Sequence, residues 1–166
     1  PHVGPGTRVA VLLRNGPPQV GLLVGLLRAG ACIVVANPGR GDDRVREDLA
    51  ALDVGILAGE TADLARFGGA SGAGLRLASD ELGTVVATGA ASDAPVNPGV
   101  AVEMLTSGTT GPPKRVPLTY ETFLRVLVGA KHYEKDQRTD VKLRSVVVVV
   151  NAPPVHVGRL FPVLQA

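Results

Sequence analysis

The sequence predicts an α/β fold, a three-layer domain in which a mostly parallel sheet lies between helices. Short aliphatic runs at residues 8–13 and 31–36 flank a segment with helical hydrophobic spacing. Such a strand–helix–strand succession builds a parallel pair with a right-handed crossover. Hydrophobic residues make up 45% and aromatic residues 3% of the 166 residues. We therefore expect a core of aliphatic strands under small-residue helices.

The first unit begins with the strand at residues 8–13. Asn15-Gly16-Pro17 then supplies a turn and a proline at the first helical position. Gly30 occupies the place that glycine favours after a helix, and residues 31–36 form the next strand. Four apolar residues between these points recur at helical spacing and are expected to face the core: Val20, Leu23, Val24 and Leu27.

The same pattern returns more weakly along the next segment. Asp42 or Asp43 is expected to cap a helix, and a strand follows at residues 54–57. Leu64 is placed in a third, short helix. Residues 68–74 and 87–98 are rich in small residues and turn formers, which indicates loops. The buried face of the helix after Asp43 is expected to consist of Val45, Leu49 and Leu52.

The last part of the chain predicts a strand at residues 100–105 and a helix that Thr119 caps. Five valines at residues 146–150 predict a central strand, and residues 156–164 predict a further helix. The length suits one domain, residues 1–166. The apolar stripe of the capped helix is expected to be Tyr120, Phe123, Leu124, Leu127 and Val128.

Composition disfavours several classes of protein. The net charge is +2, and the basic residues are scattered without a basic run interleaved with aromatics, so no nucleic-acid partner is expected. The single cysteine, Cys32, excludes an internal disulfide and suits a reducing cytoplasm, our predicted location. The longest apolar run, Val20 to Leu27, is far below the ~20 residues that cross a bilayer. The chain starts without Met and ends on an apolar segment, so we expect a piece truncated at the C-terminal end.

The chemistry is concentrated in the segment Thr106-Ser107-Gly108-Thr109-Thr110-Gly111-Pro112-Pro113-Lys114. Its glycines let the backbone approach a ligand closely, and its hydroxyls and backbone amides offer donors to phosphate oxygens. Lys114 adds a positive charge on a long stem. Only two residues separate the glycines and Arg115 follows the lysine, so the segment is not a Walker loop.

Thr-Ser-Gly-Thr-Thr-Gly-x-Pro-Lys resembles the phosphate-binding motif of the adenylate-forming (AMP-binding) superfamily. The runs at residues 4–11, 26–31 and 36–38 also look like the opening of the large N-terminal domain of these enzymes. The resemblance covers most of residues 1–164 and is weak between Gly55 and Asn97. It implies a three-layer α/β fold and most resembles the N-terminal part of a bacterial fatty-acyl-CoA ligase.

The resemblance implies an acid–thiol ligase that works in two steps. ATP and a carboxylic acid, fatty by this resemblance, give an acyl-adenylate and pyrophosphate, and coenzyme A or a carrier pantetheine then takes the acyl group. Mg²⁺ accompanies the nucleotide, and no protein ligand for it is assigned. By this resemblance Lys114 is the catalytic residue, and the phosphates are held by Thr106, Ser107, Gly108, Thr109, Thr110, Gly111 and Lys114.

Residues 153–158 resemble the family's next motif, in which a proline-rich turn leads to a histidine near the acyl pocket. His156 and Gly158 are therefore candidate substrate-binding residues, and a packing histidine is the open alternative. The chain departs from the family pattern at Arg159 and Arg115, where glycine is usual.

Two other functions remain open at this point. One is an amino-acid-activating adenylation domain of a peptide synthetase, and the other is a non-catalytic nucleotide-binding module. A nucleotide-hydrolysing switch protein is disfavoured because the Walker loop is absent. The family's ribose-binding acid, adenine-stacking aromatic, hinge and C-terminal lysine have no counterpart in the sequence, so we expect the chain alone not to catalyse adenylation. The oligomeric state and the particular acid are not specified.

Overall fold

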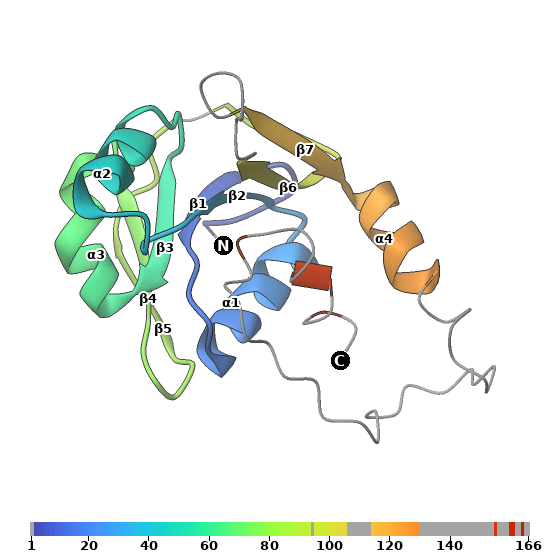
Figure 1. Ribbon diagram of the computed structural model, residues 1–166, viewed down its shortest axis with the longest axis horizontal. Coiled ribbons are helices and arrows are strands. Elements are labelled where there is room, and N and C mark those ends of the chain that lie inside the picture. Colours follow the sequence, from blue (N-terminus) through green and yellow to red (C-terminus); the bar gives the residue numbers. More distant parts are fainter. Residues whose placement is uncertain are drawn as a thin grey trace.

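A computed structural model describes residues 2–93, 95–105, 114–129, 155, 160, 161 and 164. Within these residues the strands form one sheet of order β5-β4-β3-β1-β2-β6-β7 (Figure 1). The strands are β1 (Arg8–Leu12), β2 (Cys32–Ala36), β3 (Ile56–Glu60), β4 (Leu75–Ser79), β5 (Val85–Gly89), β6 (Val100–Leu105) and β7 (Arg115–Thr119). The helices are α1 (Pro17–Arg28), α2 (Asp42–Ala50), α3 (Thr61–Phe67) and α4 (Tyr120–Gly129), with a short 3₁₀ turn, η1 (Gly68–Ala70).

The sheet is mostly parallel, as the sequence predicts. Strands β4, β3, β1, β2 and β6 run in one direction, and the antiparallel strands β5 and β7 lie at the two edges. Arg8 pairs with Cys32 at the start of β1 and β2, and Leu12 pairs with Ala36 at their end. This register places the carboxyl ends of the parallel strands at one common edge of the sheet.

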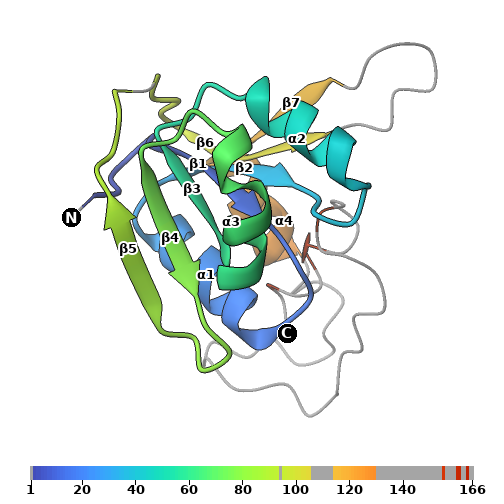
Figure 2. The ribbon, with the colours of Figure 1, turned by 90° about the vertical axis from the view of Figure 1, so that its left-hand side faces the viewer.

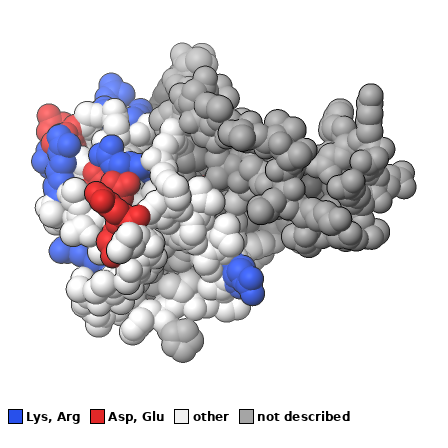
Figure 3. All heavy atoms as spheres, turned by 90° about the horizontal axis from the view of Figure 1, so that it is seen from below, with Lys and Arg blue, Asp and Glu red and all other residues white. Residues whose placement is uncertain are grey.

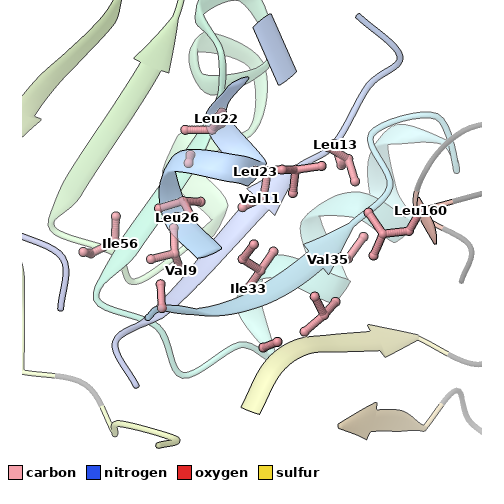
Figure 4. Packing of buried hydrophobic residues seen from close by; sticks show 14 of the residues in the cluster. Val9, Val11, Leu13, Leu22, Leu23, Leu26, Ile33, Val35, Ile56 and Leu160 are labelled. Carbon is pink, nitrogen blue, oxygen red and sulfur yellow. The ribbon is translucent and has the colours of Figure 1, made fainter. Parts of the chain in front are cut away.

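Helices cover both faces of this sheet, which confirms the three-layer α/β class. Figures 1 and 2 show α1 on one face and α2 and α3 on the other. Side chains of α1 pack against alternating residues of β1 and β2, as Figure 4 shows for Leu22, Leu23 and Leu26. Phe123 of α4 belongs to the same core. On the opposite face, Val45 and Leu49 of α2 and Leu64 and Phe67 of α3 cover Ala10, Leu12 and Val34.

The predicted core face of α1 is confirmed in part, because Leu23 is 1% exposed in the core and Leu27 packs against that core. The buried side chains are Gln19, Leu22, Leu23 and Leu26, whereas Val24 is 40% exposed and Val20 and Leu27 are half-buried. Two adjacent apolar stripes run along this helix, and hydrophobic spacing alone cannot choose between them. The end of the helix is confirmed, because Gly30 follows it with φ +76°, a conformation that favours glycine.

Three strands and one cap differ from the sequence predictions. Strands β4, β5 and β7 were not expected, and β5 includes residues 87–89 of a segment predicted as loop. Part of the other predicted loop, 68–74, forms η1. The cap of α2 is Gly41 at φ +92°, and Asp42 and Asp43 lie in the first turn without a cap hydrogen bond.

The helix after Thr119 is present and capped as predicted. The hydroxyl oxygen of Thr119 accepts a hydrogen bond from the backbone N–H of Thr122 at 3.1 Å. Phe123 is 3% exposed, but Leu124 is 59% exposed and does not belong to the buried stripe. The side chains of Leu127 and Val128 lie outside the described residues.

Two further predictions fall where the structure gives no description. The strand at 146–150 lies outside the described residues, as does most of the helix at 156–164. Leu160 is described and is 1% exposed in the α1-side core. None of the helices in the described part of the chain is long and apolar enough to span a membrane.

Candidate phosphate-binding site

The candidate site lies at the edge of the sheet where the parallel strands end. Open α/β sheets bind ligands outside the carboxyl ends of their strands. Strand β6 leaves the sheet here at Leu105, and β7 enters it at Arg115, the residue with which Leu105 is paired. The segment 106–114 therefore begins and ends at one point of this edge.

The predicted phosphate-binding residues divide into two groups. Thr106, Ser107, Gly108, Thr109, Thr110 and Gly111 lie outside the described residues, and so do His156 and Gly158. Lys114 is described. It directly precedes β7, and its side chain is exposed. The structure thus places the predicted catalytic cation at the carboxyl edge, beside the end of β6.

Arg115 is turned away from solvent, unlike most of β7. Its guanidinium donates a hydrogen bond to the backbone oxygen of Val35 on β2 at 3.0 Å. Burial lowers the pKa of Arg115, and the nearby carboxylates of Glu103 and Asp48 oppose this shift. The residue that interrupts the family pattern is therefore an internal contact of the sheet.

Other cations at this edge are paired with acids of the helices. Arg14, just after β1, binds Asp63 of α3 through two nitrogens at 2.5 and 2.7 Å. Arg40, after β2, binds Asp48 of α2 at 3.1 Å. Figure 3 shows acidic and basic side chains intermixed toward the side on which Figure 1 draws α2 and α3. On the face seen there, they do not form a patch of one sign.

A buried polar cluster is centred on Glu103 of β6, three residues before Thr106, where the signature segment begins. The Glu103 side chain is 9% exposed and accepts hydrogen bonds from Arg8 at 2.9 and 3.3 Å. It also accepts from Asn97 at 3.0 Å, and the thiol of Cys32 lies 3.5 Å away. Arg8 donates in addition to the backbone oxygen of Asp53. These contacts connect β1, β2 and β6 next to the point where segment 106–114 leaves β6.

Electrostatics in this cluster favour the ion pair. Burial raises the pKa of Glu103, but the hydrogen bonds and charge of Arg8, with the hydrogen bond from Asn97, outweigh it, so that this pKa is lowered. Burial and the adjacent carboxylate of Glu103 raise the pKa of Cys32 to about 12. Sequence reasoning missed the cluster, although an acid inside the apolar run Val-Ala-Val-Glu-Met-Leu indicates a buried partner.

Residues 2–166 match the model of the AMP-binding enzyme family. The chain belongs to this family. The resemblance of its signature segment to adenylate-forming enzymes is thereby confirmed. The medium/long-chain-fatty-acid–CoA ligase FadD6 of Mycobacterium tuberculosis (strain ATCC 25618 / H37Rv) is 32% identical, over 75% of this chain and 23% of that protein.

Solved structures of known proteins share the fold. O-succinylbenzoate coenzyme A synthetase (MenE) from Bacillus subtilis, in complex with AMP, has a TM-score of 0.66 and 21% identity over 98% of this chain and 41% of its own. Apo MatB from Rhodopseudomonas palustris has a TM-score of 0.69 and 18% identity over 98% of this chain and 33% of its own. The chain therefore spans less than half the length of these relatives.

A further structure of MenE holds ATP and a magnesium ion, with a TM-score of 0.66 and 20% identity over 98% of this chain and 42% of its own. In the part of the present chain that the structure describes, no group of three or more His, Cys, Asp or Glu residues could hold a metal ion. No protein ligand for Mg²⁺ is therefore assigned among the described residues.

Proposed function

We propose that this chain is part of an ATP-dependent acid–thiol ligase. The enzyme converts a carboxylic acid and ATP to an acyl-adenylate and pyrophosphate, and coenzyme A or a carrier pantetheine then accepts the acyl group. The observation that carries the proposal is the position of the signature segment. It leaves the sheet after Leu105 and returns at Lys114, at the edge where α/β sheets bind ligands.

In this proposal the segment holds the phosphates of ATP. Glycines at 108 and 111 permit close approach of the backbone, and the hydroxyls of residues 106, 107, 109 and 110 donate to phosphate oxygens. Lys114 neutralises the charge that develops on the departing pyrophosphate. Mg²⁺ bound to the nucleotide would supply further positive charge at this site.

We further propose a medium- or long-chain fatty acid as the substrate. The 32% identity to FadD6, whose name specifies such acids, supports this choice. His156 and Gly158 are proposed to line the acyl site, and the cytoplasm is the proposed location. The part of this chain that aligns with FadD6 covers 23% of that protein, and for the 166 residues on their own we propose ATP binding without turnover.

Pyrophosphate exchange tests this function and identifies the acid. The complete product of the gene that encodes this segment is incubated with ATP, labelled pyrophosphate and single acids from a fatty, aromatic and amino acid panel. The proposal predicts exchange with fatty acids of medium or long chain, weakened about 10²-fold in a Lys114→Ala variant. Exchange with amino acids alone would favour a peptide-synthetase adenylation domain. ATP binding without exchange by any acid would favour a non-catalytic module.

A further inference from the structure

Arg115 makes an unusual contact for the first residue of an edge strand. The sheet order around it is β2-β6-β7, so that β6 lies between Arg115 and β2. Its guanidinium nevertheless reaches the backbone oxygen of Val35 on β2 at 3.0 Å. The neighbouring Val116 is 42% exposed, whereas Arg115 is half-buried. The side chain therefore extends inward across the end of β6.

The strand pairing explains why that backbone oxygen is accessible. Paired positions between β2 and β6 end at Val34 and Glu103, while pairing between β6 and β7 continues to Leu105 and Arg115. Beyond Glu103, β6 thus stays paired with β7 and is no longer paired with β2. The guanidinium supplies Val35 with the hydrogen bond that further pairing of β2 and β6 would have supplied.

Charged groups from three elements surround the guanidinium. Glu103 of β6 and Asp48 of α2 attract it, and Arg8 of β1 repels it. Asp48 is itself held by Arg40 at 3.1 Å. A charge-assisted hydrogen bond in such a partly desolvated place is stronger than one in water. Arg115 is thus bonded to β2, and its charge is attracted by acids of β6 and α2.

We propose that Arg115 is a positioning residue for the phosphate-binding segment. By fastening the start of β7 to β2, it fixes the point where segment 106–114 returns to the sheet, and with it the backbone of Lys114. This inference rests on the proposed function only for the identity of the ligand. The hydrogen bond from Arg115 that holds β7 to β2 does not depend on any ligand.

Hydrogen–deuterium exchange of the complete gene product that contains this segment, free of ligand, tests whether Arg115 holds β7 in place. Arg115→Ala is expected to raise the exchange rate of the backbone amides of residues 115, 116, 118 and 119 about tenfold, because the strand loses its charged anchor. The amides of β1 and β3 should keep their rates. Arg125→Ala, which removes an exposed arginine of α4 paired with Glu121, is the matched control and should change neither. Unchanged exchange in residues 115–119 of Arg115→Ala overturns the proposal.

MgATP affinity of the same variants tests the consequence for the ligand. Arg115→Ala should weaken binding about tenfold while its thermal midpoint stays well above the assay temperature, and Arg115→Lys should recover most of the loss. Faster exchange at β7 with unchanged affinity would show a structural role only and overturns the positioning role. If the wild-type chain, folded, binds no MgATP, the ligand assignment fails, and the exchange data alone decide whether Arg115 holds β7.

Discussion

Arg8 and Glu103 lie 95 residues apart in the sequence and form a two-point ion pair inside the sheet, with Nη2–Oε2 and Nε–Oε1 distances of 2.9 and 3.3 Å. Their side chains are 15% and 9% exposed. Arg8 begins β1, and Glu103 lies on β6, with β2 between them. The pair therefore joins β1 to the strand that leads into the proposed phosphate-binding segment.

Removing one member of this pair should destabilise the fold strongly. In Arg8→Ala the carboxylate of Glu103 stays buried without its main counter-charge, and the expected cost is about 3–5 kcal/mol of unfolding free energy. Glu103→Gln should cost less, because the amide oxygen still accepts a hydrogen bond from Arg8. Urea unfolding measures both. The exposed pair of Arg125 and Glu121 provides the control, since Arg125→Ala should change stability by less than about 1 kcal/mol. Equal stability of Arg8→Ala and wild type would contradict the account.

The same pair predicts how stability depends on pH. The pKa of Glu103 is lower in the folded chain than its ordinary value of 4.5, so the unfolded state binds the proton first as pH falls. The stabilisation from this group is then fully present above pH 4.5 and is lost as pH falls through the folded-state pKa. Urea midpoints between pH 7 and 3 should show a steeper fall for wild type than for Glu103→Gln. If the urea midpoints of wild type and Glu103→Gln fell in parallel with pH, the loss of stability in acid would come from other groups.

Cys32 should be unreactive in the native chain. Its side chain is fully buried, and burial beside Glu103 raises the pKa of the thiol to about 12, which leaves almost no thiolate at pH 8. A chromogenic disulfide reagent should therefore label the folded chain very slowly and the urea-unfolded chain at once. Rapid labelling under native conditions would mean that β2 opens far more readily than its packing implies.

Tyr120 should anchor α4 to the turn between α1 and β2. Its hydroxyl donates to the backbone oxygen of Ala31 at 2.7 Å and lies 3.1 Å from that of Leu27. Burial raises the pKa of the Tyr120 phenol. Tyr120→Phe keeps the ring and removes the donor, so we expect a loss of about 1–2 kcal/mol in unfolding free energy, measured in urea. A loss below about 0.3 kcal/mol would mean that water replaces the hydroxyl without cost.

The sequence predicts the central strands well because their signal is local. The aliphatic runs that become β1, β2 and β6 are buried on both faces and need no knowledge of their neighbours. The edge strands are different. The residues of β5 are all exposed, and β5 is a strand because it pairs with β4. A strand that depends on its partner leaves little pattern of its own.

The candidate site likewise has one part that the sequence predicts and one part that depends on the fold. The motif identifies Lys114 and its segment from residue types and order alone, and the fold places the ends of that segment together at Leu105 and Arg115. The contact of Arg115 with Val35 depends on where β2 and β6 part, which no local pattern encodes. An arginine at that position could equally have faced solvent.

The most direct test is MgATP binding by the 166-residue chain, measured calorimetrically for wild type, Lys114→Ala and Arg28→Ala. Arg28 is an exposed cation in the last turn of α1, at the opposite edge of the sheet, and serves as the matched control. The account predicts that wild type binds, that Lys114→Ala weakens binding at least about tenfold through the loss of a charge-assisted contact, and that Arg28→Ala leaves it unchanged. Equal affinity of wild type and Lys114→Ala, or no binding by the folded wild-type chain, would contradict the assignment of this segment as the phosphate-binding site.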